Sequence, residues 1–187
     1  MTSVLGTRLH LRLEAFLNNK TLADDGLTDI EWPTLVHKLV HMAVERKWQP
    51  FRTELSVFYE ANAPHDSIDD VVVPCAGQID CLFRDEDGRL VIVDLKRTDK
   101  KLDDDEPPYG HKRCAAPMEN EWASDFNKYS LQISMYSVML KNQLGIEVGE
   151  ENRFLLQVHP SMEEAKLIKC KCFDSEATSI LNCLSIL

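Results

Sequence analysis

Two short predicted strands joined by a turn constrain the fold of this chain more than any other feature. Residues 77–84 and 89–95 are predicted as strands, and Asp85–Gly88 between them is typical of a hairpin turn. Residues 90–95 are apolar almost throughout, as expected of a central strand covered on both faces. The sequence therefore predicts a sheet built around an antiparallel hairpin.

Further helices and strands are expected on both sides of this hairpin. Apolar spacing indicates helices over residues 4–18, 33–46, 128–143 and 174–186, and strands over 52–60, 153–159 and 165–173, with 71–75 either a short strand or part of the next one. Residues 97–127 are charged and turn-rich, and a loop of this length in a compact domain is usually functional or mobile. The 187 residues suit one domain, 1–187, and the order of elements predicts an α/β fold with a central mixed β-sheet and helices on both faces.

Composition limits the classes of protein that this chain can represent. Its 31 acidic and 21 basic residues give a net charge of −10, which argues against coating nucleic acid or an anionic membrane by bulk charge. An enzyme that reaches phosphate through bound metal and a local basic patch remains compatible with this charge. Six cysteines without a CxxC pair, no secretory leader and no bilayer-length apolar run predict a soluble, intracellular protein with reduced thiols and no membrane partner.

The geometry of the hairpin turn decides whether two aspartates meet. Asp94 and Lys96 point to one face of their strand, where burial of charge is costly unless something pairs it. If the loop has three residues, with Gly88 in the left-handed conformation, Asp80 lies directly opposite Asp94, with Cβ atoms about 5 Å apart. A two-residue loop instead places the aspartates on opposite faces. The first register brings together two carboxylates, which favours Mg²⁺ or Mn²⁺ between them.

Metal-assisted phosphodiester hydrolysis requires such a set of residues. Asp80 and Asp94 would hold one or two metal ions, and the carbonyl of Leu95 would complete the coordination shell. The metal lowers the pKa of a bound water and stabilises charge on the phosphate. Lys96 would orient that water or neutralise the developing oxyanion. The alternative is a surface hairpin with a Lys–Asp ion pair, since Asp-x-Lys is a common tripeptide.

Four motifs follow one another along the chain. They are Gly6–His10 followed by Glu14, then Glu54, then Gly77–Asp80 with Asp94–Lys96, and finally Gln132–Tyr136. Together they cover about residues 4–140, and they resemble the PD-(D/E)XK nuclease superfamily, in particular its RecB-like and lambda-exonuclease-like branch. The resemblance implies a restriction-endonuclease-like core. It also implies His10 as a metal ligand, Glu54 as the upstream acid, and Asp94 in place of the commoner glutamate.

The outer motifs have structural interpretations beside the functional ones. Gln132 and Tyr136 are four residues apart and share a helix face, so both could hold Lys96 or a DNA phosphate. Tyr136 could equally be a core aromatic residue. Glu54 shares its predicted strand face with Ser56 and Phe58, and is either a metal ligand or an edge-strand charge.

Contact with DNA requires local positive charge in this acidic chain. The candidate residues follow the predicted active strand or lie in the charged loop region: Arg97, Lys100, Lys101 and Lys128. A solvated surface of mixed charge is the alternative.

The residues together predict a Mg²⁺- or Mn²⁺-dependent deoxyribonuclease. The resemblance favours an exonuclease that acts on DNA ends or single strands in repair, recombination or replication, with a homo-oligomer or a helicase or replication protein as further partners. The alternatives are a structure-specific endonuclease of the same superfamily and a catalytically inactive nucleic-acid-binding module.

Overall fold

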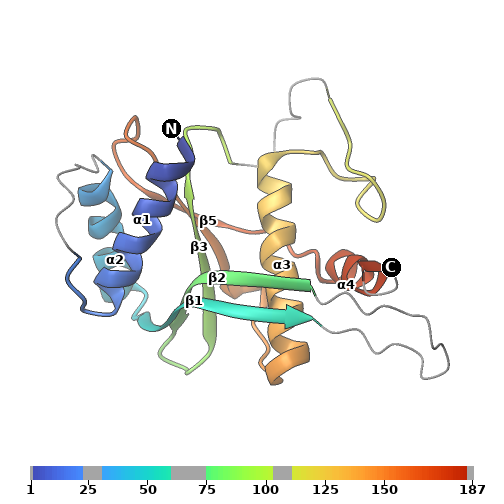
Figure 1. Cartoon of the computed structure of the whole chain (residues 1–187), viewed down its shortest axis with the longest axis horizontal. Helices are drawn as coiled ribbons and strands as arrows, with labels where there is room; N and C mark the ends of the chain where they lie inside the picture. The colour runs from blue at the N-terminus through green and yellow to red at the C-terminus, as the bar shows by residue number, and fades with distance from the viewer. Residues whose placement is uncertain (1, 23–30, 60–74, 103–110, 185–187) are drawn as a thin grey trace. The chain divides into compact units, whose positions relative to one another are not determined.

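The computed structural model describes residues 2–22, 31–59, 75–102 and 111–184 (Figure 1). The helices are α1 (Thr2–Leu17), α2 (Trp32–Glu45), α3 (Asp125–Leu144) and α4 (Asp174–Leu184), with a short 3-10 turn η1 (Glu150–Asn152). The strands are β1 (Gln49–Tyr59), β2 (Cys75–Arg84), β3 (Leu90–Arg97), β4 (Arg153–Val158) and β5 (Lys166–Lys169). The predicted sequence of helices and strands is confirmed, although β1 begins earlier and β5 is shorter than expected. Residues 71–74, where a further strand was considered, lie outside the described residues.

The strands form one mixed sheet in the order β1-β2-β3-β4-β5. β2 and β3 pair antiparallel, β3 and β4 pair parallel, and β4 and β5 pair antiparallel. The parallel pair requires a crossover connection between β3 and β4, and the segment that contains α3 provides it. The predicted α/β class with a central mixed sheet is therefore confirmed.

The hairpin between β2 and β3 has the three-residue loop that the sequence allows. The backbone N–H of Asp85 donates to the carbonyl of Arg89 at 3.0 Å, and Gly88 has a φ of 81°. Cys81 lies opposite Val93 in the resulting register. The next positions along these two strands are Asp80 and Asp94, so the turn geometry aligns the two aspartates as predicted.

The contacts divide the chain into two compact units. The first unit comprises Met1–Leu55, Ile79–Lys101 and Glu151–Lys169, and the second comprises Ser56–Gln78, Leu102–Glu150 and Cys170–Leu187. In the described part of the chain, no helix combines the length and the apolar character that crossing a membrane requires.

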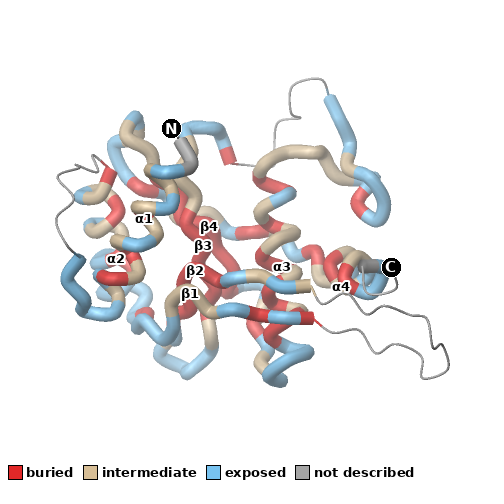
Figure 2. Tube along the Cα trace, in the orientation of Figure 1, coloured by how far each residue is buried: buried red, intermediate tan, exposed pale blue. Residues whose placement is uncertain are grey.

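In the first unit, α1 and α2 cover one face of the sheet. The buried residues of this core are Leu9, Leu13, Leu35, Leu39 and Met42 from the helices, with Cys81, Val93, Leu95 and Leu156 among those from the strands. On the opposite face of the same strands, Leu82, Ile92 and Leu155 are also buried. Figure 2 shows burial along β3 and β4, as expected for strands with an apolar sequence.

In the second unit, α3 packs against α4. Ser124 caps α3, because its side chain accepts a hydrogen bond from the backbone N–H of Asn127 at 3.1 Å. This cap explains why α3 begins at Asp125 rather than at residue 128. Gly145, with a φ of 68°, ends the helix in the left-handed conformation.

Part of the predicted loop 97–127 has regular contacts of its own. Arg113 and Trp122 form an isolated β-bridge, and the guanidinium of Arg113 lies 3.5 Å from the centre of the Trp122 ring. Residues 103–110, which include the acidic run of this loop, lie outside the described residues.

Candidate functional site

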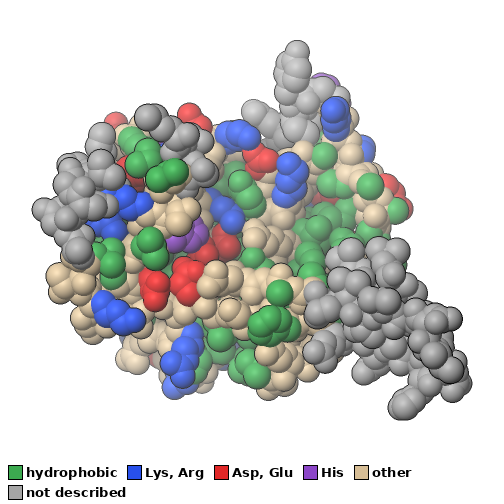
Figure 3. Space-filling view, in the orientation of Figure 1, with side chains coloured by type: hydrophobic (Ala, Val, Ile, Leu, Met, Phe, Trp, Pro, Cys, Tyr) green, Lys and Arg blue, Asp and Glu red, His purple; other side chains and the backbone are tan. Residues whose placement is uncertain are grey.

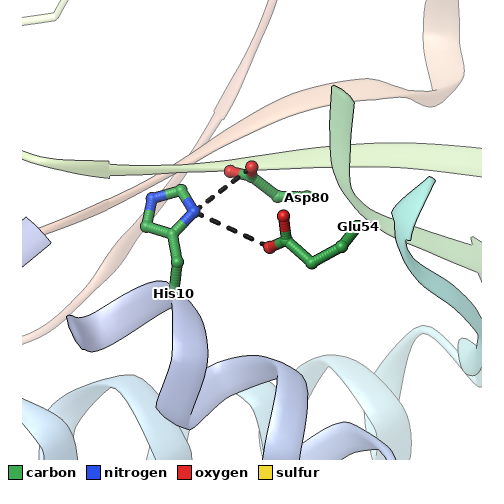
Figure 4. A group of neighbouring side chains, drawn as sticks. All are labelled: His10, Glu54 and Asp80. Atoms are coloured by element: carbon green, nitrogen blue, oxygen red, sulfur yellow. Dashed lines mark ion pairs between the residues drawn. The ribbon is translucent and has the colours of Figure 1, made fainter. Parts of the chain in front are cut away.

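Three elements of the first unit bring together one imidazole and two carboxylates (Figure 4). His10 comes from α1, Glu54 from β1 and Asp80 from β2. Nδ1 of His10 lies 3.2 Å from Oδ1 of Asp80 and 4.0 Å from Oε1 of Glu54. One potential ligand atom from each residue lies within 4.8 Å of the others. The sequence motifs that predicted these residues as ligands therefore meet in space.

Local packing explains how α1 presents its histidine. Leu9 and Leu13 are buried against the sheet, and His10, which follows Leu9, is half-buried at the margin of that contact. In the space-filling view, purple and red side chains lie next to one another over α1 and β1 (Figure 3). The site is thus open to solvent on one side, since 30% of the His10 side chain is exposed.

The backbone of Glu54 departs from regular strand geometry. Its φ of 50° is left-handed, which costs energy for any residue with a side chain. A left-handed residue also interrupts the strict alternation of side chains in β1. Glu54 is half-buried near His10, whereas Ser56 and Phe58 are exposed. The sequence carries no signal for this conformation.

Asp80 is fixed by a backbone contact on the neighbouring strand. Its Oδ2 accepts a hydrogen bond from the N–H of Leu95 at 2.7 Å, while Oδ1 faces His10. A carboxylate held in this way keeps one oxygen directed at the histidine. The sequence placed Leu95 at the site through its carbonyl, and that role stays a prediction, whereas the N–H contact was not foreseen.

Asp94 is buried and forms an ion pair with Lys96. The ammonium nitrogen of Lys96 lies 2.6 Å from Oδ2 of Asp94, and only 2% of Asp94 is exposed. The pKa of Asp94 is raised to about 6, chiefly by burial and then by the negative charge of Asp80, whereas Lys96 and His10 act in the opposite direction. The predicted Asp–Asp–Lys set is therefore electrostatically connected, although Asp94 lies outside the group of three ligand atoms.

The other two ionisable groups respond to the same crowding. The hydrogen bond with Asp80 raises the pKa of His10, and the charges of Asp80, Glu54 and Asp94 act in the same direction against the effect of burial. Burial, followed by the charge of Asp80, raises the pKa of Glu54. Three carboxylates thus share one ammonium group and one imidazole. One imidazole nitrogen and several carboxylate oxygens form a donor set that fits a divalent cation such as Mn²⁺ or Mg²⁺.

The predicted basic contacts have different environments. Arg97 donates from Nε to the carboxylate of Glu31, and both side chains are largely buried. This ion pair links the end of β3 to the start of α2, a structural role that sequence reasoning missed. Lys100 and Lys101 are exposed. Lys128 belongs to the second unit, where its ammonium lies 3.4 Å from Asp125. Contact of these four residues with DNA stays a prediction.

Gln132 and Tyr136 interact with each other on α3, as their spacing predicts. Nε2 of Gln132 donates to the hydroxyl of Tyr136 at 2.6 Å. The Tyr136 ring lies against Gly77, where an added Cβ would lie only 2.4 Å from a ring carbon. Since 8% of Tyr136 is exposed, its ring is also a core residue of the second unit. The proposed contact of this pair with Lys96 or phosphate stays a prediction.

The first unit contains one cysteine, Cys81. Cys81 is buried, and burial raises its pKa well above the ordinary value for a thiol. Its environment is that of a small apolar core residue.

Comparison with known proteins adds little to this geometry. No family model matches the sequence, and no curated protein matches it. Among solved structures, one titled "Crystal structure of SSO0001" aligns at 12% identity with a TM-score of 0.39. The alignment covers 83% of this chain and 55% of that chain, so the chain spans little more than half the length of this neighbour. At that TM-score, the likeness carries no argument about function.

Proposed function

We propose that this chain is a metal-dependent nuclease that hydrolyses phosphodiester bonds in DNA. The observation that carries this proposal is the convergence of His10, Glu54 and Asp80, whose ligand atoms lie within 4.8 Å of one another. The ion pair of buried Asp94 with half-buried Lys96 on β3 supplies a further carboxylate and the ammonium group. The order of motifs that resembles the PD-(D/E)XK superfamily supports the same function.

The first role of these residues is to hold a cation. His10, Glu54, Asp80 and Asp94 would bind one or two Mg²⁺ or Mn²⁺ ions, which when bound supply an acidified water and neutralise charge on the phosphate. The N–H of Leu95 keeps the Asp80 carboxylate in one orientation. Nδ1 of His10 must be deprotonated to act as a ligand, so protonation of His10 and occupation of the site exclude each other.

Lys96 has a separate role at the reacting phosphate. Its ammonium carries three N–H donors, and the contact with Asp94 at 2.6 Å fixes its position. A positive charge held there would orient the attacking water or stabilise the charge that develops on the phosphate oxygens. Gln132 and Tyr136 would assist by holding a phosphate group of the DNA.

The motif order favours an exonuclease that acts on DNA ends or single strands. The direct test is digestion of end-labelled linear single-stranded and double-stranded DNA beside closed circular DNA, with Mg²⁺, Mn²⁺ or EDTA. We expect metal-dependent loss of linear DNA with the circles spared. Lys96→Ala should abolish cleavage, whereas Lys166→Ala on β5, an exposed lysine of the same sheet, should retain it.

The controls separate three outcomes. Circular dichroism of Lys96→Ala establishes that the variant is folded, since removal of Lys96 leaves Asp94 buried without this cation. Cut circles would identify an endonuclease of the same superfamily. Absence of cleavage with either metal, while DNA still binds, would contradict the proposed activity and identify a binding module.

A further inference from the structure

We propose that Arg52 and Arg84, held against Phe51, form a binding track for the phosphate backbone of a DNA strand. The cluster of Arg52, Arg84 and Phe51 is called the arginine track below. It lies on β1 and β2, the two strands that carry Glu54 and Asp80. This inference rests on the proposed function, because it assigns part of the DNA surface that serves the same site.

The two guanidinium groups are positioned by one aromatic ring. The guanidinium carbon of Arg84 lies 4.4 Å from the centre of the Phe51 ring, and that of Arg52 lies 5.8 Å from it. Both distances are within the range of cation–π contacts. Phe51 is 39% exposed, and both arginines are exposed. A surface phenylalanine that orders two arginines reduces the rotamer freedom that each would lose on binding a ligand.

The charges of the neighbouring hairpin already have partners, either within the hairpin or in the segment before β1. Arg89 contacts Asp85 and Asp87 at 2.8 Å each, and Lys47 contacts Glu86 at 2.5 Å. Among the described residues, by contrast, no carboxylate lies within ion-pair distance of Arg52 or Arg84. In a chain with a net charge of −10, the arginine track is therefore a local concentration of uncompensated positive charge.

The position of the arginine track relative to the site follows from the strands themselves. Arg84 and Asp80 are four residues apart on the same face of β2, which corresponds to roughly 13 Å along the strand. Arg52 precedes Glu54 by two residues on β1, and β1 is the neighbour of β2 in the sheet (Figure 1). A DNA strand bound at the carboxylates could therefore extend along β1 and β2 to the arginines.

Guanidinium groups suit the backbone of DNA better than its bases in this arrangement. Each can donate two parallel hydrogen bonds to phosphate oxygens, and each remains charged at all relevant pH values. Contacts to phosphate add affinity without reading sequence. The arginine track would thus hold the strand in register with the site and would not select a cleavage sequence.

The test measures binding without cleavage. Fluorescence anisotropy in EDTA with a labelled 20-nucleotide single strand gives Kd over a series of salt concentrations, for wild type, Arg52→Ala, Arg84→Ala and the double variant. We expect each single variant to bind about 3- to 10-fold more weakly and the double variant to lose about 1.4 units of salt slope, since each phosphate contact on a single strand contributes about 0.7. The loss should be the same for two unrelated DNA sequences. Lys166→Ala removes one positive charge from the opposite edge of the sheet and should change Kd less than 2-fold.

A second pair of variants tests the role of the ring. Arg84→Lys keeps the charge and should retain most of the salt slope, whereas Phe51→Leu keeps both charges but removes the aromatic contact and should weaken binding about 2- to 3-fold. Unchanged Kd and salt slope in the double variant would overturn the inference, as would an equal loss in Lys166→Ala or a wild-type protein that binds no DNA.

The outcomes for the arginine track and for the nuclease activity are distinguishable. A wild-type protein that binds DNA through Arg52 and Arg84 but cuts nothing would contradict the proposed function and leave the arginine track supported. A wild-type protein that cuts DNA equally well with and without these arginines would contradict the arginine track alone. If both the nuclease activity and the arginine track are correct, the double variant should cleave a p-nitrophenyl phosphodiester at the wild-type rate, because this substrate is too short to reach Arg84.

Discussion

Both units of this chain bury polar side chains, but they satisfy them in different ways. In the second unit, the buried hydroxyl of Ser134 accepts a hydrogen bond from the backbone N–H of Phe173 at 3.0 Å, and Asn127 donates to the carbonyl of Trp122 at 2.9 Å. These side chains are neutral and the partners named are backbone groups, although Asn127 also donates to the carboxylate of Glu121 at 3.3 Å. Such contacts tie α3 to neighbouring segments and remove the cost of burying polar atoms.

The first unit also buries a neutral side chain with backbone partners, Gln157, but several of its buried polar groups carry charge, and its carboxylates repel one another. Asp80 and Asp94 are both buried, and the charge of Asp80 contributes to the raised pKa of Asp94. Glu54 adds a third carboxylate from a strained backbone. Burial of like charges destabilises the fold, so an arrangement of this kind indicates a functional site more strongly than buried polarity alone. Buried neutral side chains with hydrogen-bond partners indicate a structural role, whereas clustered buried carboxylates indicate a functional site.

The largest expected effect separates these two kinds of polar residue. Asp80→Asn keeps an oxygen that can accept from Leu95 but removes a charge from the site. We expect DNA cleavage to fall by at least about 100-fold with little change in thermal stability. Ser134→Ala, the matched change in the second unit, should instead lower the free energy of unfolding by about 1–3 kcal/mol and leave the cleavage rate unchanged. If Asp80→Asn and Ser134→Ala cleaved DNA at comparable rates, the distinction between functional and structural polar residues would be wrong.

The pH dependence of stability provides the next test. Because the folded-state pKa of Asp94 is raised to about 6, the native state binds this proton more tightly than the unfolded state does. The contribution of Asp94 to stability is therefore greatest below about pH 4 and is lost as pH rises towards 6. Asp94→Asn should remove this pH-dependent loss of stability, which is on the order of 2–3 kcal/mol. Urea unfolding at a series of pH values measures it. The difference in the free energy of unfolding between Asp94→Asn and wild type must grow between about pH 4 and pH 6. A difference that stays constant over this range would contradict the assigned pKa.

A smaller effect is expected from the close contact inside the second unit. Gly77→Ala would place a Cβ 2.4 Å from the buried ring of Tyr136, so the ring must move. We expect a loss of about 1–3 kcal/mol in the free energy of unfolding, measured with urea. Gly6→Ala is the matched control, since an added Cβ there meets nothing within 4 Å and alanine favours the helix. Equal stability of the two variants would show that Gly77 does not determine the position of the ring.

The smallest predicted effect concerns the start of α3. Ser124→Ala removes the side chain that accepts from the N–H of Asn127, and should cost about 1 kcal/mol. Ser179→Ala on α4 removes an exposed hydroxyl that donates to the carbonyl of Ser175, and should cost less than about 0.5 kcal/mol. Thermal unfolding of both variants measures the difference. If Ser179→Ala proved the more damaging change, the cap would not define the start of α3.

Much of the fold could be predicted because its signals are local. Apolar spacing placed α1 and α2, and Gly88 with a three-residue loop determined the register of β2 and β3. That register alone aligned Asp80 with Asp94. The start of α3 was missed because the Ser124 cap is a single contact without an apolar pattern.

The parts of the site that sequence could not supply depend on contacts between distant segments. Nothing in the sequence predicts the left-handed backbone of Glu54 or the hydrogen bond from Leu95 to Asp80. The burial of Arg97 against Glu31 likewise depends on how α2 meets the end of β3. Residue types, spacing and the family resemblance predicted which side chains belong to the candidate site, whereas their orientation and charge balance required the packed structure.

Titration of the purified protein with Mn²⁺ tests the central claim most directly. Electron paramagnetic resonance reports free Mn²⁺, so bound ion can be counted for wild type, His10→Ala, Asp80→Asn and the control Lys166→Ala. We expect saturable binding of one or two ions by wild type and Lys166→Ala, and at least about 10-fold weaker binding by His10→Ala and Asp80→Asn. Equal binding by all four proteins, or no saturable binding by wild type, would contradict the assignment of this cluster as a metal site.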